Sequence, residues 1–209
     1  MYLKRKIDSF LISWKESEDK KPLIVKGARQ IGKTKSIEHF AETYENFVSI
    51  NFALETKFMT ICENGFDAAS IIKNISRIDP SKKFVEGKTL ILFDEIQDFP
   101  EIATSLKSVC IDGRFDVICS GSMLGINYKK IQSNSVGYKS EYSMQSLDFE
   151  EFLWAKGYEN DVVEELLSHM KSGEAFNQTT FNVFNDLFLD YCILGGMPKV
   201  VLNYIEKGT

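Results

Sequence analysis

The sequence predicts an α/β fold, in which a parallel sheet flanked by helices is followed by an all-helical subdomain. Two observations lead to this prediction. Short apolar runs alternate with longer amphipathic stretches up to residue 147, and only helical periodicity follows from residue 148. Apolar runs separated by helical stretches are typical of strands that are buried on both faces of a parallel sheet, with helices as crossover connections.

The predicted strands are apolar runs rich in Val, Ile, Leu or Phe and bounded by turn or charged residues. They lie at residues 23–25, 47–52, 90–93 and 117–119, and a fifth strand is expected at residues 141–145. The stretches between the runs are long enough for crossover helices, which we expect at residues 33–44, 66–78 and 100–111. Residues 1–147 are therefore expected to form the α/β core.

Residues 148–209 are expected to form the helical subdomain. Apolar side chains recur there at helical spacing in three segments, and Gly173 ends the second of them, as glycine often does. The segment 195–198, Gly-Gly-Met-Pro, ends the third, because proline disfavours helix in the residue before it. The phenylalanine-rich segment 181–188 is expected to pack in a core, with an exposed docking surface as the alternative.

Composition and charge exclude several classes of protein. The chain has 209 residues, 44% of them hydrophobic, and a net charge of −5, which gives no support to nucleic-acid binding. No apolar run approaches the roughly 18 residues of a membrane span, and the charged N-terminus is unlike a signal peptide. The four cysteines and two histidines lack metal-ligand spacing. We therefore expect a cytoplasmic, reduced, globular protein.

A glycine-rich segment directly follows the first predicted strand. Residues 27–34 read Gly-Ala-Arg-Gln-Ile-Gly-Lys-Thr and match G-x-x-x-x-G-K-[ST] at each fixed position. In such a P-loop, backbone N–H groups point at phosphate oxygens, Lys33 supplies positive charge to the β- and γ-phosphates, and the Thr34 hydroxyl can bind Mg²⁺. The expected nucleotide contacts are Gly27, Ala28, Arg29, Gln30, Ile31, Gly32, Lys33, Thr34 and Lys35.

Two carboxylates, Asp94 and Glu95, end the apolar run at residues 90–93. The carboxyl end of a strand beside the P-loop strand is where ligands bind in such sheets. We expect Asp94 to hold Mg²⁺, directly or through water, and Glu95 to orient and deprotonate the attacking water. The alternative is an acidic pair that a helix dipole stabilises.

Small hydroxyl residues end the run at residues 117–119. Ser120 or Ser122 is expected to be a neutral hydrogen-bonding group that senses the γ-phosphate, and the spacing does not decide between them. The alternative is that both serines only turn the chain at a strand end. Arg29 and Gln97, close to these motifs, are either contacts of the site or ordinary solvated side chains.

Taken in order, these motifs resemble the archaeal and bacterial AAA-type ATPases. Beside the P-loop, the resemblance rests on residues 92–97 (Leu-Phe-Asp-Glu-Ile-Gln), 119–122 (Cys-Ser-Gly-Ser), 147–153 (Leu-Asp-Phe-Glu-Glu-Phe-Leu) and 195–198 (Gly-Gly-Met-Pro). The chain is similar, more narrowly, to the family in which an AAA_14 domain precedes DUF4143. The resemblance covers almost the whole chain and implies an AAA+-like sheet with a helical lid. It also implies that Pro198 approaches the nucleotide, as in the related STAND ATPases.

The resemblance further implies a function and partners. The function is hydrolysis of ATP to ADP and phosphate with Mg²⁺, coupled to movement between core and lid. The alternative is a slow nucleotide switch that controls a C-terminal effector domain, expected beyond Thr209, or a protein partner. Roles related to nucleic acid or defence rest on relatives alone. Residues 123–145 contain Lys129, Lys130 and Lys139 but no arginine, which argues against a ring whose subunits share arginines.

Overall fold

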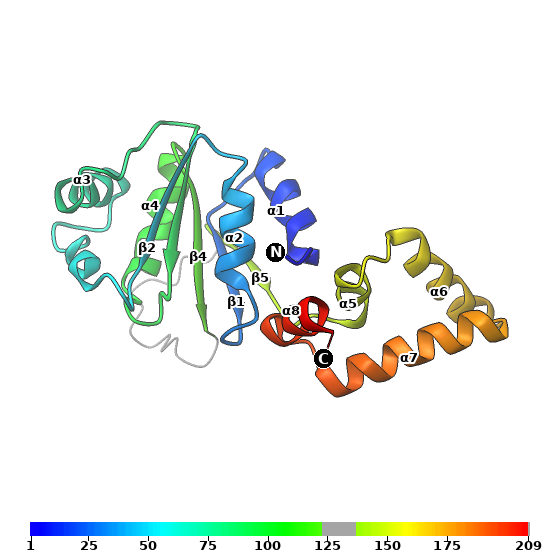
Figure 1. Cartoon of the computed structure of the whole chain (residues 1–209). Coiled ribbons are helices and arrows are strands. Elements are labelled where there is room, and N and C mark those ends of the chain that lie inside the picture. The colour runs from blue at the N-terminus through cyan, green and yellow to red at the C-terminus, as the bar shows by residue number, and fades with distance from the viewer. Residues whose placement is uncertain (123–136, 209) are drawn as a thin grey trace. The chain divides into compact units, whose positions relative to one another are not determined.

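The computed structural model describes residues 1–122 and 137–208 of the chain, which divides into two compact units (Figure 1). The sheet unit comprises Phe10–Arg29 and Lys33–Met144, and the helical unit comprises Met1–Ser9, Gln30–Gly32 and Gln145–Thr209. The division of the chain at residue 147 stays a prediction. The sequence pattern carries no sign that Met1–Ser9 groups with the C-terminal helices.

The sheet unit contains five parallel strands in the order β2-β3-β4-β1-β5. They are β1 (Leu23–Gly27), β2 (Asn46–Asn51), β3 (Thr89–Asp94), β4 (Asp116–Ser122) and β5 (Ser140–Ser143). All six residues of β3 are buried, as expected for a strand covered on both faces. The predicted α/β fold with a parallel sheet is confirmed.

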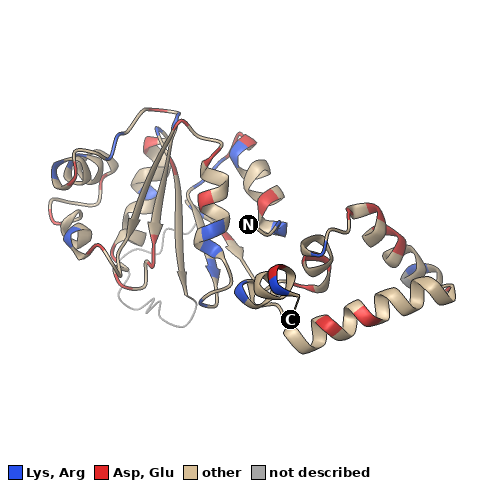
Figure 2. Cartoon of the chain, viewed as in Figure 1, with Lys and Arg blue, Asp and Glu red and all other residues tan. Residues whose placement is uncertain are grey.

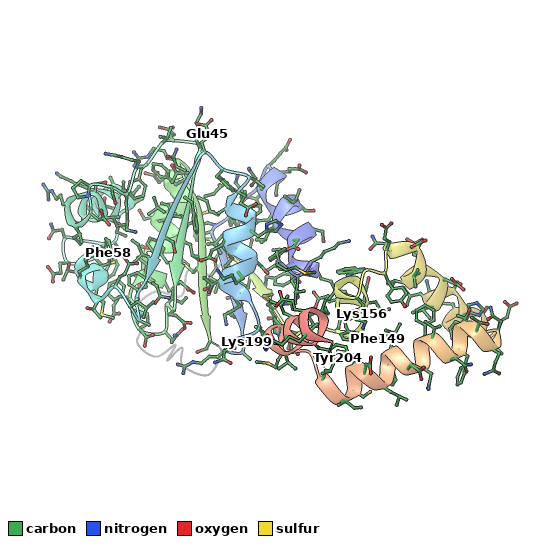
Figure 3. All side chains as sticks on the ribbon, in the orientation of Figure 1. Glu45, Phe58, Phe149, Lys156, Lys199 and Tyr204 are labelled. Carbon is green, nitrogen blue, oxygen red and sulfur yellow. The ribbon has the colours of Figure 1, made fainter. Side chains whose placement is uncertain are left out.

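Helices cover both faces of this sheet (Figure 1). The helical elements of this part of the chain are α1 (Lys6–Glu16), α2 (Lys33–Ala41), the short 3₁₀ helix η1 (Thr56–Thr60), α3 (Ala68–Ile78) and α4 (Ile102–Asp112). Elements η1, α3 and α4 share one apolar core with alternate strand residues, including Ile91 and Phe93. Phe58 of η1, labelled in Figure 3, is fully buried in this core. On the other face, Trp14 of α1 packs against Phe40 of α2.

The helical unit contains α5 (Phe149–Ala155), α6 (Asn160–Ser172), α7 (Gln178–Leu194) and α8 (Pro198–Lys207). Its core includes Leu3, Leu147, Phe152 and Val201, and Figure 3 labels Phe149, Lys156 and Tyr204 beside it. Helix α8 begins at Pro198, whose restricted φ suits the first residue of a helix. Among the helices of the described residues, none has the length and hydrophobicity of a membrane span.

Helix α7 is amphipathic rather than buried all round. Leu187 is buried and Phe184 is partly buried, whereas Phe181 and Phe188 are 51% and 49% exposed. The prediction that residues 181–188 pack in a core is therefore wrong for Phe181, whereas half-exposed Phe188 packs edge-on against Phe149 with ring centroids 5.3 Å apart. The charged side chains of α7 are all acidic (Figure 2).

Two motifs that carry the family resemblance pack against each other in the helical unit. The backbone N–H of Leu147 donates to the Gly196 carbonyl at 2.8 Å. A Cβ atom at Gly196 would lie 2.1 Å from the Leu147 carbonyl oxygen, so no side chain fits at this position. The segments 147–153 and 195–198 thus pack against each other within the helical unit.

Candidate functional site

The predicted P-loop joins β1 to α2, since Gly27 ends the strand and Lys33 begins the helix. The first N–H groups of a helix lack intrahelical partners and carry partial positive charge, so the start of α2 offers donors to an anion. Gly32 has φ 95° and Gln30 has φ 64°. Glycine adopts such a conformation without steric cost, whereas Gln30 is strained, as residues at functional sites often are.

Lys33 is buried on the inner side of the loop, with only 6% of its surface exposed. Its Nζ donates to the carbonyl oxygens of Gly27 at 3.1 Å and of Ala28 at 2.7 Å. Burial lowers the pKa of the Lys33 ammonium from its ordinary value, while the carboxylates of Glu95 and Asp94 act in the opposite direction. An ammonium in this place can exchange backbone carbonyls for phosphate oxygens.

Asp94 is the centre of a hydrogen-bond network at the carboxyl end of β3. Its Oδ2 accepts from Thr34 Oγ1 at 3.0 Å and from Asn51 Nδ2 at 3.1 Å. Its Oδ1 accepts from the Glu95 N–H at 3.0 Å and from the Ser120 hydroxyl. These donors come from α2, from the end of β2, from β4 and from the residue after β3, and they fix the orientation of the carboxylate. The two residues expected to bind the metal, Thr34 and Asp94, are thus in direct contact.

Thr34 and Asp94 suit Mg²⁺, which prefers oxygen ligands and is usually held by one or two carboxylates together with substrate phosphates. Their oxygens converge to 3.0 Å at the first turn of α2, next to the loop expected to bind phosphates. The described residues contain no group of three or more His, Cys, Asp or Glu side chains that could hold a metal. The pair fits an ion that takes further oxygen ligands from phosphate and water.

Glu95 follows β3 directly and has φ 55°. Within the described residues, Glu95 and Gln30 are the non-glycine residues with positive φ, and both lie in the predicted site. Such a conformation costs about 1–3 kcal/mol and persists where surrounding contacts hold it. One such contact is the Gln97 side chain, whose Nε2 donates to Glu95 Oε2.

Ser120 lies within β4 and Ser122 is its last residue, and they pair with Val25 and Gly27 of β1. The alternative that the serine only turns the chain does not apply to Ser120, which is followed by two further strand residues, and it stays open for Ser122, the last residue of β4. Both serines are buried, and the Ser120 hydroxyl donates to Asp94. The structure thus brings them to the P-loop strand, and which serine senses the γ-phosphate stays a prediction.

Two residues at or near the loop were missed in the sequence. Asn51 donates a hydrogen bond to Asp94. The sequence feature that could have identified Asn51 is its position near the end of a predicted strand, at the same edge of the sheet as Asp94. Arg5, in the helical unit, is 4% exposed, and its Nη1 donates to the Ile31 carbonyl of the loop at 2.7 Å. Its Nε lies 3.1 Å from Glu151 Oε1. No motif marks Arg5 in the sequence.

The remaining predicted residues differ in their surroundings. In the helical unit, a Cβ atom at Gly32 would lie 3.7 Å from Pro198 Cγ, so Pro198 lies against the P-loop glycine. Arg29 is exposed, and exposed Lys35 pairs with Glu38 at 2.7 Å. Lys129 and Lys130 lie outside the described residues. Lys139 pairs with Glu141 at 2.9 Å.

Comparisons with known proteins agree with this fold and loop. A family model described as an AAA domain, AAA_14, matches residues 19–153. No curated protein sequence matches the chain. Among solved structures, a Walker-type ATPase of Pyrococcus abyssi superposes with a TM-score of 0.53 at 14% identity, covering 100% of this chain and 69% of that chain.

Two further structures show the same fold. The Drosophila ORC bound to DNA has a TM-score of 0.51 at 13% identity, covering 95% of this chain and 57% of that chain. The S. cerevisiae Hsp104–ADP complex has a TM-score of 0.53 at 13% identity, covering 99% and 30%. This chain thus spans less than two thirds of the length of these two structures. Identities this low show a shared fold and nothing more.

Proposed function

Since the chain belongs to the AAA domain family AAA_14, we propose that it binds ATP with Mg²⁺ and hydrolyses it to ADP and phosphate. The observation that carries the proposal is the network around Asp94, which joins the start of α2 to the ends of β2, β3 and β4. A carboxylate whose orientation is fixed by such donors, beside a phosphate-binding loop, suits a nucleotide held with a metal ion.

Each residue of the site has a proposed role. Lys33 and the N–H groups of the loop bind the β- and γ-phosphates, and Thr34 with Asp94 would hold Mg²⁺. When bound, the ion supplies positive charge to the phosphate oxygens. Glu95 takes a proton from a water whose oxygen bonds to the γ-phosphorus, while the bond from that phosphorus to the β–γ bridging oxygen of ADP breaks. Ser120 or Ser122 senses the γ-phosphate.

Hydrolysis is proposed to change the arrangement of the helical unit. In support, residues Gln30–Gly32 of the loop group with that unit, where Arg5 donates to the Ile31 carbonyl and Pro198 lies against Gly32. A loop that moves with the γ-phosphate would therefore move these contacts. Amide hydrogen exchange in α5 and α8 is expected to differ between the ATP and ADP complexes. Equal exchange in the two complexes would count against this coupling.

A slow nucleotide switch that controls an effector domain or protein partner is the second candidate. It is favoured by the absence of arginine from residues 123–145, since a lysine cannot reproduce the planar fork with which an arginine stabilises a transferring phosphate. The net charge of −5 favours a protein over a nucleic acid as that partner. Multiple turnover faster than about 1 per second would favour the hydrolase over the switch.

Phosphate release by the purified chain tests the proposal. Lys33→Ala is expected to weaken ATP binding by about 100-fold or more, since hydrogen bonds to charged groups contribute about 1.5–3 kcal/mol each. Glu95→Gln is expected to keep ATP binding and to lose about 10²–10⁴ in turnover. Equal turnover in the two variants and the unchanged chain would overturn the site assignment.

An ion pair elsewhere in the sheet unit provides matched controls for both variants. Lys88 Nζ lies 2.7 Å from Glu45 Oε1, and Glu45 is labelled in Figure 3. Both residues are next to the strand starts of β2 and β3, at the edge of the sheet opposite to Asp94. Lys88→Ala and Glu45→Gln remove the same chemical groups and are expected to leave binding and turnover unchanged.

A further inference from the structure

We propose that Gln97 is a positioning residue, which holds the carboxylate of Glu95 and ties it to the end of β4. This inference rests on the proposed function, because it concerns the base of the hydrolysis. It assigns a task to a side chain that sequence patterns leave open between a site contact and an ordinary solvated residue. Glu95, Gln97, Gly121 and Ser122 all belong to the sheet unit.

The amide of Gln97 bridges two parts of the site. Its Nε2 donates to Glu95 Oε2 and lies 3.2 Å from Asp98 Oδ2, and its Oε1 accepts from the Ser122 N–H at 3.1 Å. A side-chain amide carries a donor and an acceptor at opposite corners, so one orientation satisfies both the carboxylate and the N–H group. A carboxylate or an amine in this position would fail at one of the two ends.

The main chain around Gln97 is fastened to the same strand. The Ile96 N–H donates to the Ser120 carbonyl at 3.0 Å, and Ile96 is buried. Ser122 pairs with Gly27, the residue at which β1 enters the P-loop. The Gln97 amide therefore links the expected base to the last residue of β4, beside the strand that leads into the loop.

Gly121 is what allows Gln97 to occupy this position. A Cβ atom at residue 121 would lie 2.9 Å from Gln97 Oε1 and 3.1 Å from Ile96 Cγ1. Gln97 Oε1 is the end of a flexible side chain, so an added methyl group would displace the amide before it displaced the backbone. The glycine between Ser120 and Ser122 thus reserves space for Gln97, rather than turning the chain.

Positioning matters here because Glu95 is a long side chain on a strained backbone, with φ 55°. The amide holds Oε2, and a carboxylate has a second oxygen that can accept the proton of the attacking water. A reacting group displaced by about 1 Å can cost about 10²-fold in rate. Gln97 is therefore expected to affect the chemical step and not the binding of nucleotide.

The first test is steady-state hydrolysis by Gln97→Ala, together with nucleotide titration and urea unfolding. We expect kcat to fall by about 10- to 100-fold, with KM for ATP, nucleotide Kd and the unfolding midpoint close to those of the unchanged chain. Gln178→Ala is the matched control, since Gln178 is exposed on α7 and its amide donates to Asn182 Oδ1 at 2.7 Å. It is expected to leave kcat unchanged.

The second test is a double-mutant cycle. Gly121→Ala is expected to lower kcat as Gln97→Ala does, because the new methyl group displaces the same amide. Adding Gly121→Ala to Gln97→Ala should then cost little more, since the amide is already absent. Losses that multiply in the double variant would show that Gly121 acts by another route and would break the link between the two residues.

The outcomes separate this inference from the proposed function. If Glu95→Gln is inactive while Gln97→Ala turns over normally, the positioning role is wrong and the proposed function stands. If Glu95→Gln turns over normally, the proposed function is wrong, and the inference about Gln97, which rests on it, is wrong as well. If Gln97→Ala loses nucleotide binding and unfolding midpoint together with turnover, Gln97 is a structural residue and the inference is overturned.

Discussion

The end of β4 in the sheet unit and the segment between α7 and α8 in the helical unit each contain a glycine at which an added Cβ atom would meet another group too closely. At Gly121 the obstacle is the tip of the Gln97 side chain, and at Gly196 it is the backbone of Leu147. A side-chain tip can rotate away, whereas a carbonyl in a hydrogen-bonded backbone cannot. A glycine in a motif can therefore serve the placement of a functional group in one region and the closure of the fold in another.

Each unit also contains a buried carboxylate, Asp94 in the sheet unit and Glu151 in the helical unit. One of them serves a functional group and the other the fold, as the two glycines do. Asp94 accepts from the end of β2, from the residue after β3, from β4 and from α2, next to the loop expected to bind phosphate. Glu151 accepts from the N–H groups of Lys6 and Asp148 and pairs with buried Arg5, so it caps α5 and neutralises a charge. The first arrangement is suited to a ligand, and the second to stability.

Among the variants that test this comparison, Glu151→Ala is expected to lower the free energy of unfolding most. Removing one member of a buried ion pair leaves Arg5 charged and unpaired, which costs about 3–5 kcal/mol. Urea unfolding should show this loss. Glu150→Ala is the control, because Glu150 pairs with the more exposed Lys6 at 2.7 Å and is expected to cost under about 1 kcal/mol. Similar losses from both variants would remove the structural role given to Glu151.

Gly196→Ala is expected to come next, at about 3 kcal/mol of unfolding free energy, because the added methyl group meets a backbone that cannot move aside. Gly121→Ala should cost under about 1 kcal/mol, since it displaces one side-chain tip. Urea unfolding of the two variants side by side measures this difference. If Gly121→Ala were the more destabilising, the contrast between the two glycines would be reversed.

A smaller free-energy change is expected from Asp94→Asn. The variant should bind ATP about tenfold more weakly in Mg²⁺, or by about 1.4 kcal/mol, because the neutral amide is a poorer ligand for the ion. When EDTA chelates the Mg²⁺, the variant and the unchanged chain should bind ATP with similar affinity. Nucleotide titrations with and without the metal check this. A tenfold difference that persists in EDTA would mean that Asp94 acts through the loop and not through the ion.

The smallest effect is expected from Phe181→Ser, at about 0.5 kcal/mol of unfolding free energy, since half of this side chain is already exposed. Phe152→Ala, at a fully buried position of the same unit, should cost about 3–5 kcal/mol. Urea unfolding separates the two. A large loss at Phe181 would show that a partner or second copy covers this side of α7.

The strands and the P-loop could be predicted from the sequence because their signals are local. Apolar runs mark β1, β3 and β4 within a few residues, and the spacing of glycine, lysine and threonine in 27–34 is a short pattern. The short helix η1 was not predicted, because one turn has too few residues to show a periodicity. Asp94 and Glu95 were found because they end a strand.

The contacts of Asn51 and Gln97 in the site could not be predicted, because they join residues far apart in the chain and no motif marks them. Asn51 and Asp94 are 43 positions apart, and Gln97 and Ser122 are 25 apart. Their meeting depends on strand order and register, which no local pattern contains. The exposure of Phe181 has a similar reason, since hydrophobic spacing marks a helix without saying how wide a face its neighbours cover.

The grouping of Met1–Ser9 with the C-terminal helices has a consequence for synthesis on the ribosome. The backbone N–H of Lys6 bonds to Glu151 Oε1 at 2.7 Å, across 145 positions. At about 5–20 residues per second, the nascent chain waits about 7–30 seconds before that acceptor is made. During this time Arg5 lacks the Glu151 carboxylate with which it pairs in the folded unit. The residues of the sheet unit are made before residues 145–208, so Met1–Ser9 can join their unit only after those later residues have been made.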